Sequence, residues 1–197
     1  MGRKAVEAQG KLYNIAEAQA GYFTAFQAQS VGFSRPVLVY HTKIGRFKRV
    51  AHGIYRLAQF PSSQFEDLFI AWLQTGPNSV ISHDSALALY GLSDALPAEI
   101  HITIPRTGSR RRRGLRLHTQ HLEADEITRR AGLPVTTTAR TIADVAIAGM
   151  ADELVQQAID EAIQRGLVTR RALELQARRR KGRAAFLIFE TLKEAPQ

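Results

Sequence analysis

Residues 21–57 decide the fold of the N-terminal part of the chain, and they read GYFTAFQAQSVGFSRPVLVYHTKIGRFKRVAHGIYRL. Thr24 is followed three residues later by Gln27, which is the spacing of a capping box at a helix start. A short helix is therefore expected over residues 25–31. Gly32 follows it, where a left-handed residue commonly ends a helix.

A second helix is expected from a cap at Ser34 to about Ile44, where Gly45 ends it. Pro36 falls in its first turn, where the backbone amide has no partner within the helix. Two short helices joined by a glycine turn predict a helix-turn-helix. After it, residues 47–50 and 54–57 have the composition of two strands joined by a tight turn. A hairpin in this place predicts the wing of a winged helix-turn-helix.

One face of the second of these helices is predicted to contact nucleic acid. Pro36, Val39, Tyr40 and Lys43 share that face by their spacing, and a helix fits the major groove of DNA. His41 is assigned to the core. The predicted DNA-binding residues are Arg35, Pro36, Val39, Tyr40, Lys43, Arg46, Lys48, Arg49 and His52. The alternative is a protein-interaction module whose basic residues are only solvated.

The charge distribution supports an anionic partner. The chain has 27 lysines and arginines against 18 acidic residues, a net charge of +9. Residues 1–60 hold nine of the basic side chains and only two acidic ones. A basic segment of this kind is typical of nucleic-acid binding, although a compositional bias toward arginine gives the same total.

Composition also excludes several classes of protein. The chain has no cysteine, which excludes disulfides, thiolate zinc sites and a cysteine nucleophile. No apolar run is long enough to span a membrane. We therefore expect a cytoplasmic protein without a membrane partner.

The predicted fold class is α+β, with a winged helix-turn-helix at residues 1–60 and a mixed helical domain with a small antiparallel sheet at residues 61–197. Proline and serines after residue 60 mark the boundary. Residues 100–104 and 115–118 alternate as strands. Matching their apolar faces in a hairpin sets Ile104 opposite Leu115, and His101 then faces His118.

Two arginine-rich segments lie in the second domain. Arg110, Arg111, Arg112 and Arg113 form a block too dense to pack, which predicts a second anion-binding loop, with a solvated loop as the alternative. The run from Arg178 to Arg183 is interpreted either as a nucleic-acid contact or as a solvated helix end.

Metal and catalytic sites are not expected. The best histidine cluster is His101, His118 and His121 with Asp125, but the spacing of His118 and His121 on a strand points their rings to different faces. Ser82, His83 and Asp84 are adjacent at a helix start, so they point in different directions and form no catalytic triad. The sequence thus predicts no catalytic residue, no metal and no cofactor.

Several blocks together resemble a known family. The stretches that carry the likeness are residues 21–28, 32–35, 45–47 and 49–57, then 80–93, 100–105, 132–137 and 139–144. In this order they resemble the AbiEi-type antitoxins of type IV toxin-antitoxin systems. The resemblance implies a winged helix that represses its own operon at inverted repeats. It also implies a second domain that counters a nucleotidyltransferase-like toxin without necessarily binding it.

The function expected from the residues and the resemblance is that of a DNA-binding antitoxin and transcriptional autorepressor that is not an enzyme. Its expected partner is the double-stranded DNA of its own promoter, bound as a monomer or weak dimer. Two alternatives remain open. One is an RNA- or protein-binding toxin neutraliser that acts through residues 110–113, and the other is a metal-dependent nuclease-type enzyme in the second domain.

Overall fold

The structure is a computed structural model that describes residues 3–92, 97–105 and 112–194. It is a mixed α+β protein that divides into two compact units. The first comprises Met1–Pro77 with Ala131–Leu133, and the second comprises Asn78–Arg130 with Pro134–Gln197.

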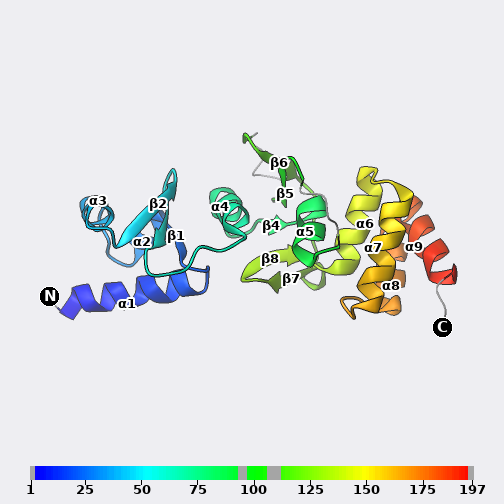
Figure 1. The fold of residues 1–197 in the computed structure, drawn as a ribbon, viewed down its shortest axis with the longest axis horizontal. Helices are drawn as coiled ribbons and strands as arrows, with labels where there is room; N and C mark the ends of the chain where they lie inside the picture. The colour runs from blue at the N-terminus through cyan, green and yellow to red at the C-terminus, as the bar shows by residue number, and fades with distance from the viewer. Residues whose placement is uncertain (1–2, 93–96, 106–111, 195–197) are drawn as a thin grey trace. The chain divides into compact units, whose positions relative to one another are not determined.

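Helices and a small sheet make up the first unit. Its elements are α1 (Arg3–Glu17), β1 (Tyr22–Thr24), α2 (Ala25–Ser30), α3 (Arg35–Lys43), β2 (Phe47–Ala51), β3 (Ile54–Leu57) and α4 (Glu66–Thr75). The strands form an antiparallel sheet in the order β1-β3-β2 (Figure 1). Strand β1 was not predicted from the sequence.

Local signals explain why α2, α3 and the β2–β3 hairpin form where they were predicted. The Thr24 side chain accepts a hydrogen bond from the Gln27 amide and the Gln27 side chain reaches back, which completes the capping box. Ser34 is the N-cap of α3, with Pro36 in the first turn. The hairpin turns at Gly53, whose φ of +70° suits a residue without Cβ.

The core of the first unit is aromatic. Phe23 is fully buried, and its ring lies 5.1 Å from that of Phe47 and 5.8 Å from that of Tyr55, measured between centroids. Leu12, Ala16, Ala28, Phe33 and Leu38 complete the buried cluster. This core holds the inner faces of α1, α2 and α3 against the sheet.

Helix α4 belongs to the first unit, although the sequence boundary after residue 60 assigned it to the second. The Tyr22 hydroxyl donates a hydrogen bond of 2.5 Å to the Glu66 carboxylate, and the Tyr22 ring stacks on Phe69 at 5.3 Å. Because these contacts tie α4 to β1, the first unit extends to Pro77.

A five-stranded sheet characterises the second unit. Its strands are β4 (Val80–Ile81), β5 (Ile100–Thr103), β6 (Leu115–His118), β7 (Ile127–Arg130) and β8 (Leu133–Thr136), in the order β6-β5-β4-β8-β7. Helix α5 (His83–Tyr90) follows β4, begins at the N-cap Ser82 and ends at the left-handed Gly91. A 3₁₀ turn, Ala124–Glu126, precedes β7.

The predicted antiparallel hairpin of this unit is wrong. Strands β5 and β6 are parallel, with Ile100 opposite Leu115 and His101 opposite Arg116. An in-register parallel pair aligns the alternating apolar residues as well as a hairpin does, so the alternation could not distinguish the two. The sheet is mixed, because β5 is antiparallel to β4 and β4 is parallel to β8.

Four helices complete the second unit: α6 (Thr138–Ala148), α7 (Asp152–Gln164), α8 (Arg170–Arg180) and α9 (Gly182–Glu194). They pack together beyond the sheet (Figure 1). Their shared core includes Ile142, Val155, Ile159, Leu173 and Ile188, none more than 2% exposed. These buried side chains form the core between the four helices.

Candidate nucleic-acid interface

Helix α3 presents an apolar and basic outer face. Val39 and Tyr40 expose 52% and 59% of their surface, which is unusual for large hydrophobic residues. Arg35 and Lys43 are exposed at the two ends of the helix. Pro36 is exposed as well, so all five predicted residues of α3 are available to a partner.

The inner face of α3 is narrow. Leu38 is buried, but Val37 and Ile44 expose 38% and 46% of their surface. His41 is half-buried, with its ring 4.9 Å from that of Phe47. Its pKa is lowered by burial and, to a lesser extent, by the charge of Arg46. Leu38 and His41 thus orient the outer face.

The β2–β3 hairpin carries further positive charge. Lys48 and Arg49 are exposed on β2, and Lys48 lies opposite Arg56 on β3. Both side chains are positively charged, and together they raise the local positive potential. At the hairpin turn, the Arg49 guanidinium lies 3.2 Å from Nδ1 of His52. Arg46 is exposed at the start of the hairpin.

Within the described residues, the cations of this surface form no ion pair. No ion pair joins Arg35, Lys43, Arg46, Lys48 or Arg49 to a carboxylate anywhere in the described ranges. The two acidic residues of the first 60, Glu7 and Glu17, are both on α1, and Glu7 pairs with Lys11 at 2.7 Å. We call these five cations the α3–hairpin surface.

The predicted second anion-binding loop is only partly described. Arg110 and Arg111 lie outside the described residues. Arg112 and Arg113 are exposed, and Arg112 forms an isolated bridge with Leu115. The role of this loop stays a prediction.

The basic run at residues 178–183 is largely engaged within the protein. Arg179 forms two hydrogen bonds with the Asp125 carboxylate, the shorter being 2.7 Å. Arg180 lies 3.7 Å from Glu126. Arg183 donates to the carbonyls of Ala146 and Met150 and to the Asp152 carboxylate. These contacts give the run a structural role at the helix ends.

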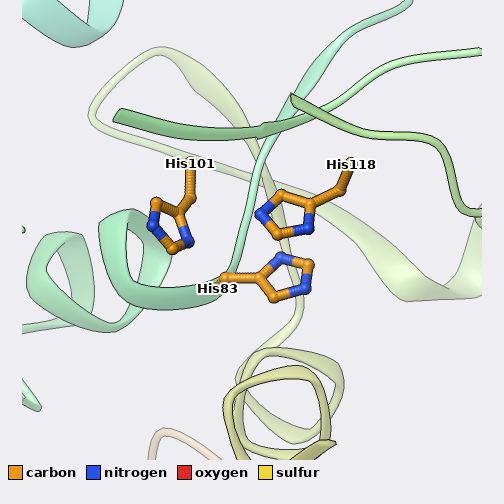
Figure 2. A group of neighbouring side chains, drawn as sticks. All are labelled: His83, His101 and His118. Carbon is orange, nitrogen blue, oxygen red and sulfur yellow. The ribbon is translucent and has the colours of Figure 1, made fainter. Parts of the chain in front are cut away.

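The histidine cluster considered from the sequence has a different membership in the structure. The His121 side chain is 83% exposed and lies 3.3 Å from Glu123, while Asp125 pairs with Arg179. The rings of His101 and His118 do approach, at 5.2 Å between centroids. Their third neighbour is His83, from the start of α5 (Figure 2). No local sequence pattern indicates that His83 joins His101 and His118, because the position of His83 depends on how β4 pairs with β5.

None of the helices in the described ranges is both long and apolar enough to cross a membrane.

Comparisons with known proteins concern both units. Residues 79–189 match a family model described as the AbiEi antitoxin C-terminal domain. No curated protein matches the chain. Among solved structures, the crystal structure of the RV2827C protein from Mycobacterium tuberculosis is similar, with a TM-score of 0.56 and 14% identity. The match covers 97% of this chain and 78% of that one, and at this identity it shows a shared fold.

Proposed function

Because this chain belongs to the AbiEi antitoxin family, whose domain spans more than half of it, we propose that it is a DNA-binding antitoxin of a type IV toxin-antitoxin system. In this proposal it also represses its own operon by binding inverted repeats in the promoter. We place it in the cytoplasm, as a monomer or weak dimer on DNA.

The proposal interprets the first unit as a winged helix-turn-helix. Helices α2 and α3 are joined by a turn at Gly32, and the β2–β3 hairpin follows directly. This order of elements supports α3 as the recognition helix and the hairpin as the wing.

The observation that carries the proposal is the α3–hairpin surface, with five exposed cations and no carboxylate partner among the described residues. DNA phosphates supply the missing negative charge. Binding to them releases condensed counterions, which provides most of the affinity of non-specific binding. The surface combines these cations with exposed apolar groups on one helix.

Each part of the surface has a role in the proposed complex. Helix α3 enters the major groove, where Val39 contacts a thymine methyl group and Tyr40 reaches a base edge or a phosphate. Arg35 and Lys43 anchor the helix ends to the backbone. Lys48 and Arg49 hold the neighbouring phosphates from the wing. Repression follows because the bound protein occupies the promoter.

The second unit is proposed to counter the toxin. The functional partner is a nucleotidyltransferase-like toxin, and no direct contact with it is required. We propose no catalytic activity for this chain.

The test is fluorescence anisotropy with the full chain, on its own upstream duplex and on a shuffled duplex of equal length. We expect tighter binding to the upstream duplex. Replacing Lys43 or Arg49 by alanine should weaken binding to both duplexes and reduce the slope of log K against log salt by about 1, because each variant loses one phosphate contact.

Lys11→Ala is the matched control. It removes one positive charge from the first unit, but Lys11 lies on α1 and is already paired with Glu7. We expect its affinity and its salt slope to equal those of the unchanged protein. If Lys43→Ala, Arg49→Ala and Lys11→Ala all weaken DNA binding equally, net charge alone accounts for the binding. That result would contradict the proposed recognition surface.

A further inference from the structure

Three histidines from three separate elements meet in the second unit. His83 begins α5, His101 lies on β5 and His118 ends β6. One ring nitrogen from each lies within 4.8 Å of the other two, and Figure 2 shows the rings turned toward one another. The rings of His83 and His118 are stacked, with centroids 3.5 Å apart.

The cluster is buried and held by a network of hydroxyl groups. His83 and His101 expose 2% and 7%, and His118 is half-buried. Ser82 Oγ lies 3.0 Å from Nδ1 of His83 and accepts a hydrogen bond from the Thr103 hydroxyl at 2.8 Å. The backbone amide of His101 donates to Ser85 Oγ at 2.8 Å. These contacts position the His83 ring and the backbone of His101.

His83 also adopts an unusual backbone conformation. Its φ is +50°, in the left-handed region that residues with a Cβ rarely occupy. Strain of this kind concentrates at functional sites, where the surrounding structure maintains it. Here it occurs at the residue that brings the third ring to His101 and His118.

A carboxylate stands next to the cluster. Asp84 Oδ2 lies 2.9 Å from Nδ1 of His101. Histidines that bind metals characteristically contact a carboxylate of this kind, which orients the ring and increases its basicity.

Within the part of the chain that the structure describes, one ring nitrogen of the cluster is left without a partner. The buried Nε2 of His118 has no hydrogen-bond partner among the residues described. A buried acceptor without a partner costs free energy, and a metal ion would satisfy it.

We propose that His83, His101 and His118 bind one divalent transition-metal ion, preferentially zinc, with Asp84 orienting His101. Imidazole ligands without thiolates suit zinc, and three protein ligands leave a fourth position for water or another oxygen ligand. Zinc–nitrogen bonds of about 2.0–2.1 Å place tetrahedral ligand atoms about 3.4 Å apart. The His83 and His118 rings are stacked with 10° between their planes, so one of them rotates out of the stack when both lone pairs point at the ion. The site is independent of the proposed DNA binding.

The experiment uses the full chain with its purification tag removed and its metals stripped by chelator. Zinc chloride is titrated by calorimetry, and the bound metal is counted by elemental analysis after dialysis. We expect one zinc per chain. His118→Gln and His101→Gln should lower the affinity at least about 100-fold, and Asp84→Asn by about 10- to 100-fold, as for outer partners of metal ligands.

His121→Gln is the matched control, since His121 is three residues from His118 but lies on the surface away from the cluster. It should bind zinc like the unchanged chain. Failure of the unchanged chain to take up zinc would overturn the proposal, as would full uptake by the His118 and His101 variants.

If a variant is unfolded by circular dichroism, the visible spectrum of the unchanged chain with cobalt decides. Intense absorption typical of tetrahedral cobalt, displaced by zinc, supports the site. If this absorption is absent, the proposed metal site is wrong.

Discussion

Arg140 shows how one buried charge organises the second unit. Its side chain is fully buried on α6, and its guanidinium contacts three partners. Two hydrogen bonds of 2.8 and 2.9 Å reach the Asp144 carboxylate, and one of 2.6 Å reaches Glu126. The third partner is Gln120, at 2.6 Å. Buried charges are tolerated when they are fully paired in this way.

We predict that Arg140→Ala lowers the free energy of unfolding by about 3–5 kcal/mol, because the buried Asp144 carboxylate loses its counterion. Among the described cations, Glu126 then keeps only the more distant Arg180. Urea denaturation followed by circular dichroism measures the change. Arg178→Ala is the control, since that side chain is 73% exposed and 4.0 Å from its carboxylate partner. Its effect should stay within about 0.5 kcal/mol. A loss below about 1 kcal/mol for Arg140→Ala would contradict the prediction.

At the scale of elements, the contact between β1 and α4 determines where the first unit ends. Tyr22 is fully buried on β1, and its hydroxyl donates to Glu66 on α4. Burial, and then the carboxylate of Glu66, raise the pKa of Tyr22 to about 12. The folded state therefore holds the phenol proton more tightly than the unfolded chain does.

This difference predicts sensitivity to alkali. An unfolded tyrosine titrates near pH 10, so the stabilisation by Tyr22 is complete below about pH 10 and is lost as the pH rises toward 12. Tyr22→Phe should lower the free energy of unfolding at pH 7 by about 1–2 kcal/mol, since a hydrogen bond to a carboxylate is removed. The variant should also lose less stability than the unchanged protein between pH 10 and 12. Urea titrations over this range measure both effects.

Tyr13→Phe serves as the comparison, because Tyr13 is 45% exposed on α1. It should leave both the neutral stability and the alkaline loss unchanged. If Tyr22→Phe and the unchanged protein lose the same free energy of unfolding between pH 10 and 12, the result would argue against the contact between β1 and α4.

At the scale of the whole molecule, the two proposals assign different ligands to different units. A ligand that binds only the folded state protects the region it contacts from local opening. Upstream DNA should slow amide hydrogen exchange in residues 35–43 and 47–57. Zinc should slow it in residues 80–90, 100–103 and 115–118. Mass spectrometry of the full chain measures both patterns.

His118→Gln provides the control for this experiment. It should abolish the protection by zinc and leave the protection by DNA intact. Protection of residues 35–43 by zinc, or of residues 115–118 by DNA, would show that the ligands do not separate between the units as we propose.

Prediction from the sequence succeeded where the signal is local. The capping box of Thr24 and Gln27 acts over one helical turn and lies where it was predicted. The N-cap position of Ser34 and the positive φ of Gly32 also lie where they were predicted. The exposed residues of α3 were predicted because a helix repeats its faces every three to four residues. The DNA-contacting role assigned to these residues stays a prediction.

The sequence by itself therefore determined the helices and the hairpin of residues 21–57, the charge of the α3–hairpin surface and the family resemblance. Only the tertiary structure decided that β5 and β6 are parallel, that α4 joins the first unit and that His83 completes the histidine cluster. The physical reason is the distance along the sequence over which each interaction acts. Caps and periodic faces are set by neighbours within a few residues, whereas strand direction and the meeting of distant side chains depend on chain segments that come together only in the folded protein.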